Sequence, residues 1–263
     1  MFQTIYQVDA FTDRPYTGNP AAVCILEKPR DDKWMQNVAL EMNLSETAFL
    51  HKEGEDYRLR WFTPEQEVKL CGHATLASAH ILWEEKHLPS DQKAIFHTLS
   101  GVLTARSVGE WIELEFPSVL EHQVSPPTGL AEALGVSLKY VGKNEQDYLV
   151  EVASEKTVRG LQPNLNLLQT IPARGIIVTS LSDSGKYDFI SRFFAPRAGV
   201  NEDPVTGSAH CCLGPFWGKL LKKDRLKAYQ ASSRGGVIHI RLDGERVYLK
   251  GQAITMMRSE FLE

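Results

Sequence analysis

The sequence is poor in cysteine, and it has neither a run of basic residues nor an apolar run long enough to span a bilayer. Its few thiols lie in apolar or small-residue surroundings without C-x-x-C spacing, so no disulfide framework is expected and a reducing cytoplasm fits. The formal net charge of -4 without a basic stretch argues against nucleic acid as a partner. The missing apolar run argues against a membrane partner, and polar residues near the start (Gln3, Gln7, Asp9) argue against a signal peptide. The four cysteines are Cys24, Cys71, Cys211 and Cys212.

Motifs that bind nucleotides or metal ions are also missing. The chain has no G-x-x-x-x-G-K-[ST] and no G-x-G-x-x-G segment, so nucleotide binding lacks a motif. It has no H-x-x-E-H, H-E-x-x-H or paired C-x-x-C spacing either. His73 and His80 are seven residues apart and would supply only two ligands from one helix face. We therefore expect no catalytic metal ion.

What the chain does contain is a pattern that occurs twice. With 263 residues, of which 43% are hydrophobic and 24% charged, it is expected to form one to two globular domains. Each half has strand-like segments and one small-residue helix, which indicates a duplicated α/β (α+β) fold with a ligand cleft between two pseudo-symmetric halves. Proline and glycine between residues 117 and 129 mark the boundary. We expect one half at residues 1–118 and the other at 119–263, and the last strand is free to cross back to the first half.

The two helix starts of this repeat carry the functional argument. Residues 61–79 and residues 193–210 each have an aromatic strand end, a proline, a short loop and then a glycine, Gly72 or Gly207. A glycine there lets a ligand approach the bare backbone N–H groups, and the helix dipole favours an anion. Two such starts are able to clamp one anionic substrate. The alternative is a pair of ordinary helix starts.

Glu46 is the best candidate for proton transfer. It stands in residues 44–50, a segment that otherwise reads as a buried strand. An apolar setting raises the pKa of a carboxyl group towards working pH, which makes it usable as a general base and acid. The alternative is a glutamate on an edge strand that points to water.

Three further residues stand beside the two helix starts. Asp203 is able either to cap the second helix or to bind a substrate hydroxyl or amine, and capping is the commoner role. His73 and Ser208 each lie one residue into a glycine-led start, within reach of a ligand on the backbone amides. A satisfied buried histidine and an ordinary helix-start serine are the alternatives.

Five segments of the sequence resemble the phenazine-biosynthesis PhzF-like isomerases in family order, and the resemblance covers the whole chain. It implies a diaminopimelate epimerase-like fold in which each half curls a sheet around a central helix. It also implies that a glutamate moves a proton between carbons of a small carboxylic acid, without metal or organic cofactor, in a protein that is commonly a homodimer. The segments are residues 9–12, 18–23, 43–49, 70–75 and 202–210.

The resemblance also implies roles for single residues. Glu46 matches the acid/base residue, and Asp203 and His73 match further residues of the catalytic site. The matching substrate-binding positions are Gly72, Ala74, Gly207, Ser208 and Asn19.

Epimerases of this fold group use two facing cysteines, and the sequence departs from that pattern. Cys71 resembles the first of them, but Pro204, or in another alignment Thr206, stands where the second would be. Two-thiol racemisation is therefore not expected. An epimerase or racemase of the same fold, or a binding protein that kept the cleft, remain the alternatives to an isomerase.

Pro215 interrupts the second helix of the repeat. Proline lacks an N–H group and clashes with the preceding turn. We expect that helix to kink or end near Leu213.

Overall fold

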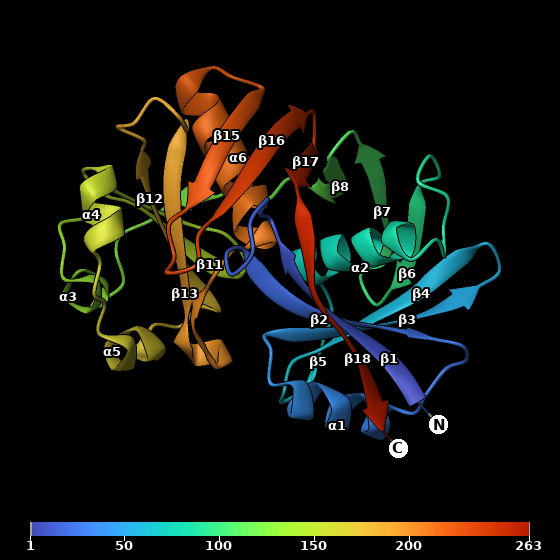
Figure 1. Ribbon diagram of the computed structural model, residues 1–263. Coiled ribbons are helices and arrows are strands. Elements are labelled where there is room, and N and C mark those ends of the chain that lie inside the picture. The colour runs from blue at the N-terminus through green and yellow to red at the C-terminus, as the bar shows by residue number, and fades with distance from the viewer. Residues whose placement is uncertain (1, 263) are drawn as a thin grey trace. The chain divides into compact units, whose positions relative to one another are not determined.

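The computed structural model describes residues 2–262, which form two compact units (Figure 1). Unit 1 contains the chain up to Phe116 and again from Tyr248, and unit 2 contains Pro117–Val247. The chain returns to unit 1 within β17 (Arg246–Gly251). Among the described residues, no helix is long and apolar enough to cross a membrane.

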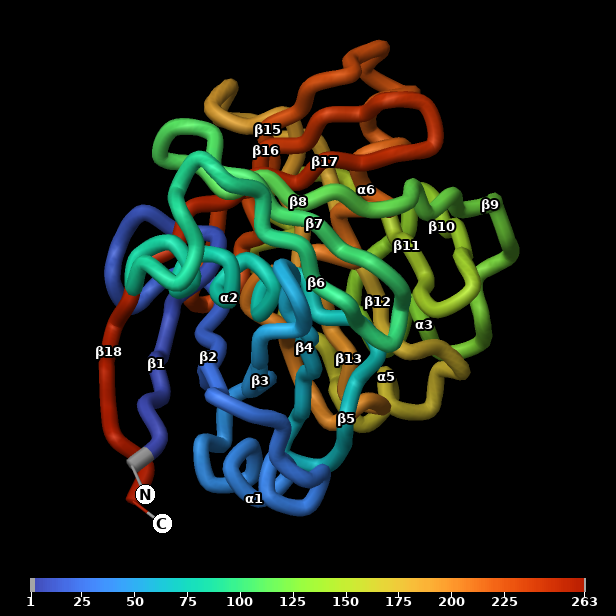
Figure 2. Tube along the Cα trace, turned by 90° about the vertical axis from the view of Figure 1, so that its right-hand side faces the viewer, coloured from blue at the N-terminus to red at the C-terminus, as the bar shows by residue number. Residues whose placement is uncertain are grey.

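Unit 1 is a curled sheet with one long helix against it, α2 (Gly72–Glu84). The last strand lies antiparallel beside the first, with Thr4 opposite Glu260 (Figure 2). A second helix, α1 (Asp32–Met42), connects β2 to β3, and the two-residue strand β5 (Glu67–Val68) pairs with β4. In sheet order the strands are β18 (Ala253–Leu262), β1 (Phe2–Ala10), β2 (Asn19–Leu26), β3 (Glu46–Glu53), β4 (Asp56–Phe62), β6 (Ala94–Thr98), β7 (Gly101–Val108) and β8 (Trp111–Pro117).

Unit 2 has the same construction around α6 (Gly207–Leu221). Its short helices are α3 (Leu130–Leu134), α4 (Glu155–Gly160) and α5 (Leu165–Thr170), with the 3₁₀ turn η1 (Pro196–Ala198). The strand β14 (Val200–Asp203) pairs with β13. In sheet order the other strands are β9 (His122–Gln123), β10 (Tyr140–Lys143), β11 (Asp147–Glu151), β12 (Gly175–Leu181), β13 (Phe189–Ala195), β15 (Arg225–Gln230) and β16 (Gly236–Asp243).

The strand pairings of the two units repeat each other. In unit 1, β2–β3 is parallel, β3–β4 and β4–β5 are antiparallel, β4–β6 is parallel and β6–β7 is antiparallel. In unit 2 the pairs β11–β12, β12–β13, β13–β14, β13–β15 and β15–β16 follow the same sequence of directions. The long helix follows the short fourth strand of each series, β5 or β14. The duplicated fold with one central helix in each half is thus confirmed.

Each central helix is buried on nearly all sides. Alanine, serine and threonine fill the first turns of α2, and residues 73–79 of that helix are all buried. In α6, Gly214 allows the helix to approach β16 closely, because a Cβ atom there would lie 2.9 Å from Cγ2 of Ile240. A helix without an exposed face belongs inside a core. The first turn of each is therefore held in one place by the surrounding sheet.

The expectation that the second helix ends near Leu213 is wrong, because α6 continues to Leu221 with Pro215 inside it. Proline at this position leaves the carbonyl of Cys211 without its usual N–H partner four residues on. The backbone N–H of Val119 donates to that carbonyl at 3.1 Å. A segment from outside the helix thus replaces the lost hydrogen bond, and packing in the core keeps the chain helical beyond the proline.

Candidate active site

Glu46 is the first residue of β3 and lies inside the sheet of unit 1. Its strand pairs with β2 on one side and β4 on the other, and Glu46 itself stands opposite Ala21. The side chain is 17% exposed. The alternative of an edge-strand glutamate pointing to water is therefore wrong, and most of the side chain is buried.

His73 is the residue that faces this carboxylate. Its Nε2 lies 3.3 Å from Oε2 of Glu46. On the other side of the ring, Nδ1 lies 3.2 Å from Nδ2 of Asn19 and 3.5 Å from Sγ of Cys71. Burial lowers the pKa of His73 from 6.5 to about 3, because an imidazolium loses its hydration there. The imidazole is neutral at physiological pH.

Hydrogen bonds around Asn19 determine which nitrogen of His73 carries the proton. Ser45 Oγ donates to Oδ1 of Asn19 at 3.4 Å, so the amide nitrogen of Asn19 faces His73. An amide NH₂ group only donates, which makes Nδ1 the acceptor. The ring proton then resides on Nε2, the nitrogen that lies 3.3 Å from Oε2 of Glu46. Asn19 is fully buried, and its side-chain amide is hydrogen-bonded to the ring of His73.

Cys71 completes this group as the residue before α2. One donor atom each from Glu46, Cys71 and His73 lie within 4.8 Å of one another. The search for metal motifs missed this set, because Glu46 comes from a strand and the other two from a helix start. Linear spacing carries no signal for such a combination.

The two central helices begin differently from α1, α4 and α5. α1, α4 and α5 each have a side-chain cap, in which Asp31, Ser154 and Asn164 accept a hydrogen bond from a first-turn N–H group. Among the described hydrogen bonds, the N-cap residues of α2 and α6, Cys71 and Thr206, make no such side-chain bond. The first-turn amides, which belong to Gly72–Ala74 and to 207–209, are thus left to other acceptors.

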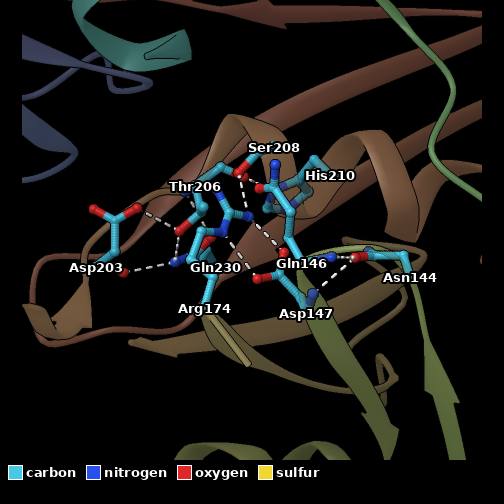
Figure 3. Close-up of polar contacts among 9 residues, drawn as sticks. All are labelled: Asn144, Gln146, Asp147, Arg174, Asp203, Thr206, Ser208, His210 and Gln230. Carbon is cyan, nitrogen blue, oxygen red and sulfur yellow. Dashed lines mark hydrogen bonds and ion pairs between the residues drawn. The ribbon is translucent and has the colours of Figure 1, made fainter. Parts of the chain in front are cut away.

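The start of α6 is held by a second network (Figure 3). Asp203 accepts a hydrogen bond from Oγ1 of Thr206 at 2.5 Å, whereas the N-cap position belongs to Thr206. The amide of Gln230 bridges this turn, since its Oε1 accepts from the N–H of Thr206 at 2.9 Å and its Nε2 donates to the Asp203 carbonyl at 2.7 Å. The capping role considered for Asp203 is therefore wrong, and its carboxylate is half-buried beside the helix start.

Ser208 has a partner that the sequence analysis did not find. Nη2 of Arg174 donates to Oγ of Ser208 at 3.0 Å. The same guanidinium makes an ion pair with Asp147, with Nε 2.9 Å from Oδ1, and the side chain of Asp147 is 2% exposed (Figure 3). Asn144 Oδ1 accepts from the N–H of Asp147 at 2.8 Å and so closes the turn before β11. Arg174 precedes a buried strand in sequence, with no motif around it.

His210 stabilises the same helix start from inside the core. Its Nδ1–H donates to the carbonyl of Thr206 at 2.8 Å. Burial lowers its pKa to about 4, and the hydrogen bond to Thr206 opposes part of that shift. The ring is therefore neutral and has a structural role.

The structure thus gathers the candidate residues into one group per unit. Glu46 faces His73, which is hydrogen-bonded to Asn19, and the amides of Gly72 and Ala74 belong to the same helix start. In unit 2, Asp203 and Ser208 stand at one helix start but contact different partners. That both groups face one substrate stays a prediction.

The chain has relatives over its whole length. The family described as "Phenazine biosynthesis-like protein" matches residues 8–259. An uncharacterized isomerase of Halalkalibacterium halodurans is 59% identical over 263 residues, which cover 100% of this chain and 99% of the relative. The crystal structure of a PhzF family protein from Enterococcus faecalis has a TM-score of 0.96 at 40% identity and covers 100% of both chains.

A more distant structure shares the fold alone. A hydroxyproline epimerase from Agrobacterium vitis, solved with bound trans-4-hydroxy-L-proline, matches with a TM-score of 0.66 at 12% identity, over 99% of this chain and 91% of that one. The family match and the identity over the full length support one conclusion. The chain belongs to the phenazine biosynthesis-like, PhzF-type family of isomerases.

Proposed function

We propose that the protein is a cofactor-independent isomerase that moves a proton between two carbons of a small carboxylic acid, with Glu46 as the acid/base group. The contact between Glu46 and the neutral ring of His73 carries this proposal. The partial burial of the Glu46 side chain supports the proposal as well, because a proton-transfer group needs access to substrate but little competing water.

The neutral state of His73 is central to the mechanism. An imidazolium 3.3 Å from the carboxylate would form a full ion pair and hold Glu46 in its ionised form. A neutral ring at this distance places no positive charge beside the carboxylate, so the same oxygen pair is able to take up a proton and return it. Asn19, which we first expected to bind substrate, serves in this proposal to position His73.

The two helix starts provide the electrostatic part of the proposal. Removing a proton α or vinylogous to a carboxylate places negative charge on the carboxylate oxygens. First-turn amides without a side-chain cap are donors available to such oxygens, at the positive end of the helix dipole. Mutational precedent assigns roughly 3–4 kcal/mol of transition-state stabilisation to one donor of this kind.

Asp203, Ser208 and Arg174 have supporting roles in this scheme. The half-buried carboxylate of Asp203 is suited to accept a hydrogen bond from a substrate hydroxyl or amine. Ser208, oriented by Arg174, is suited to donate to a substrate oxygen. An epimerase mechanism with two thiols is disfavoured, since Pro204 has no acid or base group and the hydroxyl of Thr206 donates to Asp203. We further propose that the protein is a homodimer and that it resides in the cytoplasm. Light scattering on the purified protein would test the dimer.

The test is hydrogen exchange in deuterium oxide. The protein is incubated with a panel of small carboxylic acids that have an acidic C–H group α or vinylogous to the carboxylate, and ¹H NMR follows loss of each signal. Exchange or conversion of at least one acid by the unmodified protein, but not by a folded Glu46→Gln variant, is expected. If Glu46 returns the same proton, a substrate labelled with deuterium should transfer its label internally. Equal exchange by both proteins would remove Glu46 from the reaction.

A further inference from the structure

The group formed by Glu46, Cys71 and His73 has a property that proton transfer does not require. A carboxylate oxygen, a thiol sulfur and an imidazole nitrogen lie within 4.8 Å of one another. Within residues 2–262, this is the one set of three such side chains whose donor atoms come so close. The mechanism uses Glu46 and His73, whereas it leaves the buried thiol of Cys71 without a chemical role.

The separations suit a tetrahedral zinc ion. Bonds of about 2.0–2.1 Å to nitrogen and oxygen and about 2.3 Å to sulfur place neighbouring ligands roughly 3.3–3.6 Å apart. Sγ of Cys71 lies 3.5 Å from Nδ1 of His73, which is close to that spacing, and a carboxylate oxygen of Glu46 completes a set of donor atoms within 4.8 Å of one another. No pair in the set exceeds 4.8 Å, and the three donors must move closer together to bind one ion.

The chemistry of the donors favours the same class of ion. Nitrogen and sulfur ligands select zinc and similar borderline-soft cations over Mg²⁺ or Ca²⁺, which prefer oxygen. The ring nitrogen nearest to Cys71 is Nδ1, which accepts from Asn19, so an ion that binds there takes the place of the Asn19 amide. The thiol of Cys71 must release its proton on binding: S–H is broken, S–Zn is formed and one proton goes to the buffer.

We propose that Glu46, Cys71 and His73 form an inhibitory binding site for Zn²⁺ and related cations such as Cd²⁺. The ion occupies the carboxylate that would otherwise take up the substrate proton, so it blocks the reaction rather than supporting it. Binding of the ion is independent of the proposed function, whereas the inhibition rests on it. The partly exposed side chain of Glu46 provides the route from solvent.

The experiment measures binding in the absence of any substrate. Equilibrium dialysis of the metal-free protein against Zn²⁺ counts bound ions, and titration with Co²⁺ shows whether a thiolate-to-metal charge-transfer band appears. One ion per chain, with release of a proton, is expected. Cys71→Ser should weaken binding at least tenfold and abolish the band. Cys24→Ser, which alters another buried thiol of the same unit, should change neither.

Several results would overturn the proposal. Less than one ion bound, no cobalt–thiolate band, or unchanged binding in Cys71→Ser would each exclude the site. Turnover is then measured with and without Zn²⁺ for each variant against itself, and the chelator EDTA should reverse the loss. A protein that binds zinc at this site but has no isomerase activity would refute the proposed function and leave the zinc site standing.

Discussion

The starts of α2 and α6 have the same backbone arrangement, a glycine after a residue without a side-chain cap. They differ in the side chains around them. α2 begins beside a carboxylate, a neutral imidazole and a thiol. α6 begins beside a carboxylate, a serine and a guanidinium that is already paired with Asp147. The first set is able to exchange a proton and the second is able to hold oxygen atoms in place. In the proposed function, the duplicated fold supplies two helix starts that bind the substrate anion, and only the first carries the acid/base group.

The largest effect should come from Glu46, because it distinguishes the first helix start from the second. Glu46→Gln keeps the size of the side chain but cannot accept a proton. Turnover should fall at least as far as the roughly 10²–10⁴-fold contribution of a general acid–base group, since this residue would serve both steps. The unfolding midpoint in urea should change little. Near-normal turnover by the folded variant would make Asp203 the next residue to test.

Loss of Arg174, which lies beside the start of α6, should lower the free energy of unfolding of the protein. Arg174→Met leaves the carboxylate of Asp147, which is 2% exposed, without its cation. Removing one partner of a buried ion pair costs roughly 3 kcal/mol or more, and urea unfolding measures the loss. The double variant Arg174→Met with Asp147→Asn should recover much of it, because the buried charge is gone. Equal instability of the single and double variants would show that the charge is not the cause.

His73, at the start of α2, should make the stability of the folded protein fall at acidic pH. Its pKa is about 3 in the folded protein and near 6.5 when unfolded, so below pH 6.5 only the unfolded state binds the proton. Stability should therefore fall as the pH drops from 6.5 towards 3, by up to about 1.4 kcal/mol per pH unit. Urea unfolding at pH 7.5 and 5.0 should show a smaller loss in His73→Gln than in the unmodified protein. The exposed His122→Gln control should behave like the latter.

The smallest effect on turnover is expected at Cys71. Pro204 leaves it without a thiol partner, so Cys71→Ala should cost some packing energy and keep most of the activity. Rates measured beside those of Glu46→Gln test this expectation. An inactive but folded Cys71→Ala variant would restore a thiol mechanism. Exhaustive chelation of the unmodified enzyme should likewise leave its rate unchanged, whereas activity that requires added zinc would show that the ion is a cofactor.

Local features of the sequence predicted much of the fold. The ends of α1 follow such local signals, because the side chain of Asp31 caps its first turn and Asn43 ends it with a left-handed backbone. Such signals act within one turn of a helix, so neighbouring residues suffice to determine them. The error at Pro215 has the opposite cause. Val119, far away in the chain, supplies the missing hydrogen bond, and a local rule cannot anticipate it.

In the candidate site, too, some features follow from local sequence and others from the tertiary structure. Sequence by itself determined the residue types, the two glycine-led helix starts and Glu46 as the acid/base candidate. Only the tertiary structure decided that Asn19, 54 positions from His73, turns that ring towards Glu46, and that Arg174, 34 positions from Ser208, binds its hydroxyl. The register of paired strands and the packing of α2 and α6 against them bring these side chains together. Contacts of this kind depend on the whole fold, and no spacing along the chain encodes them.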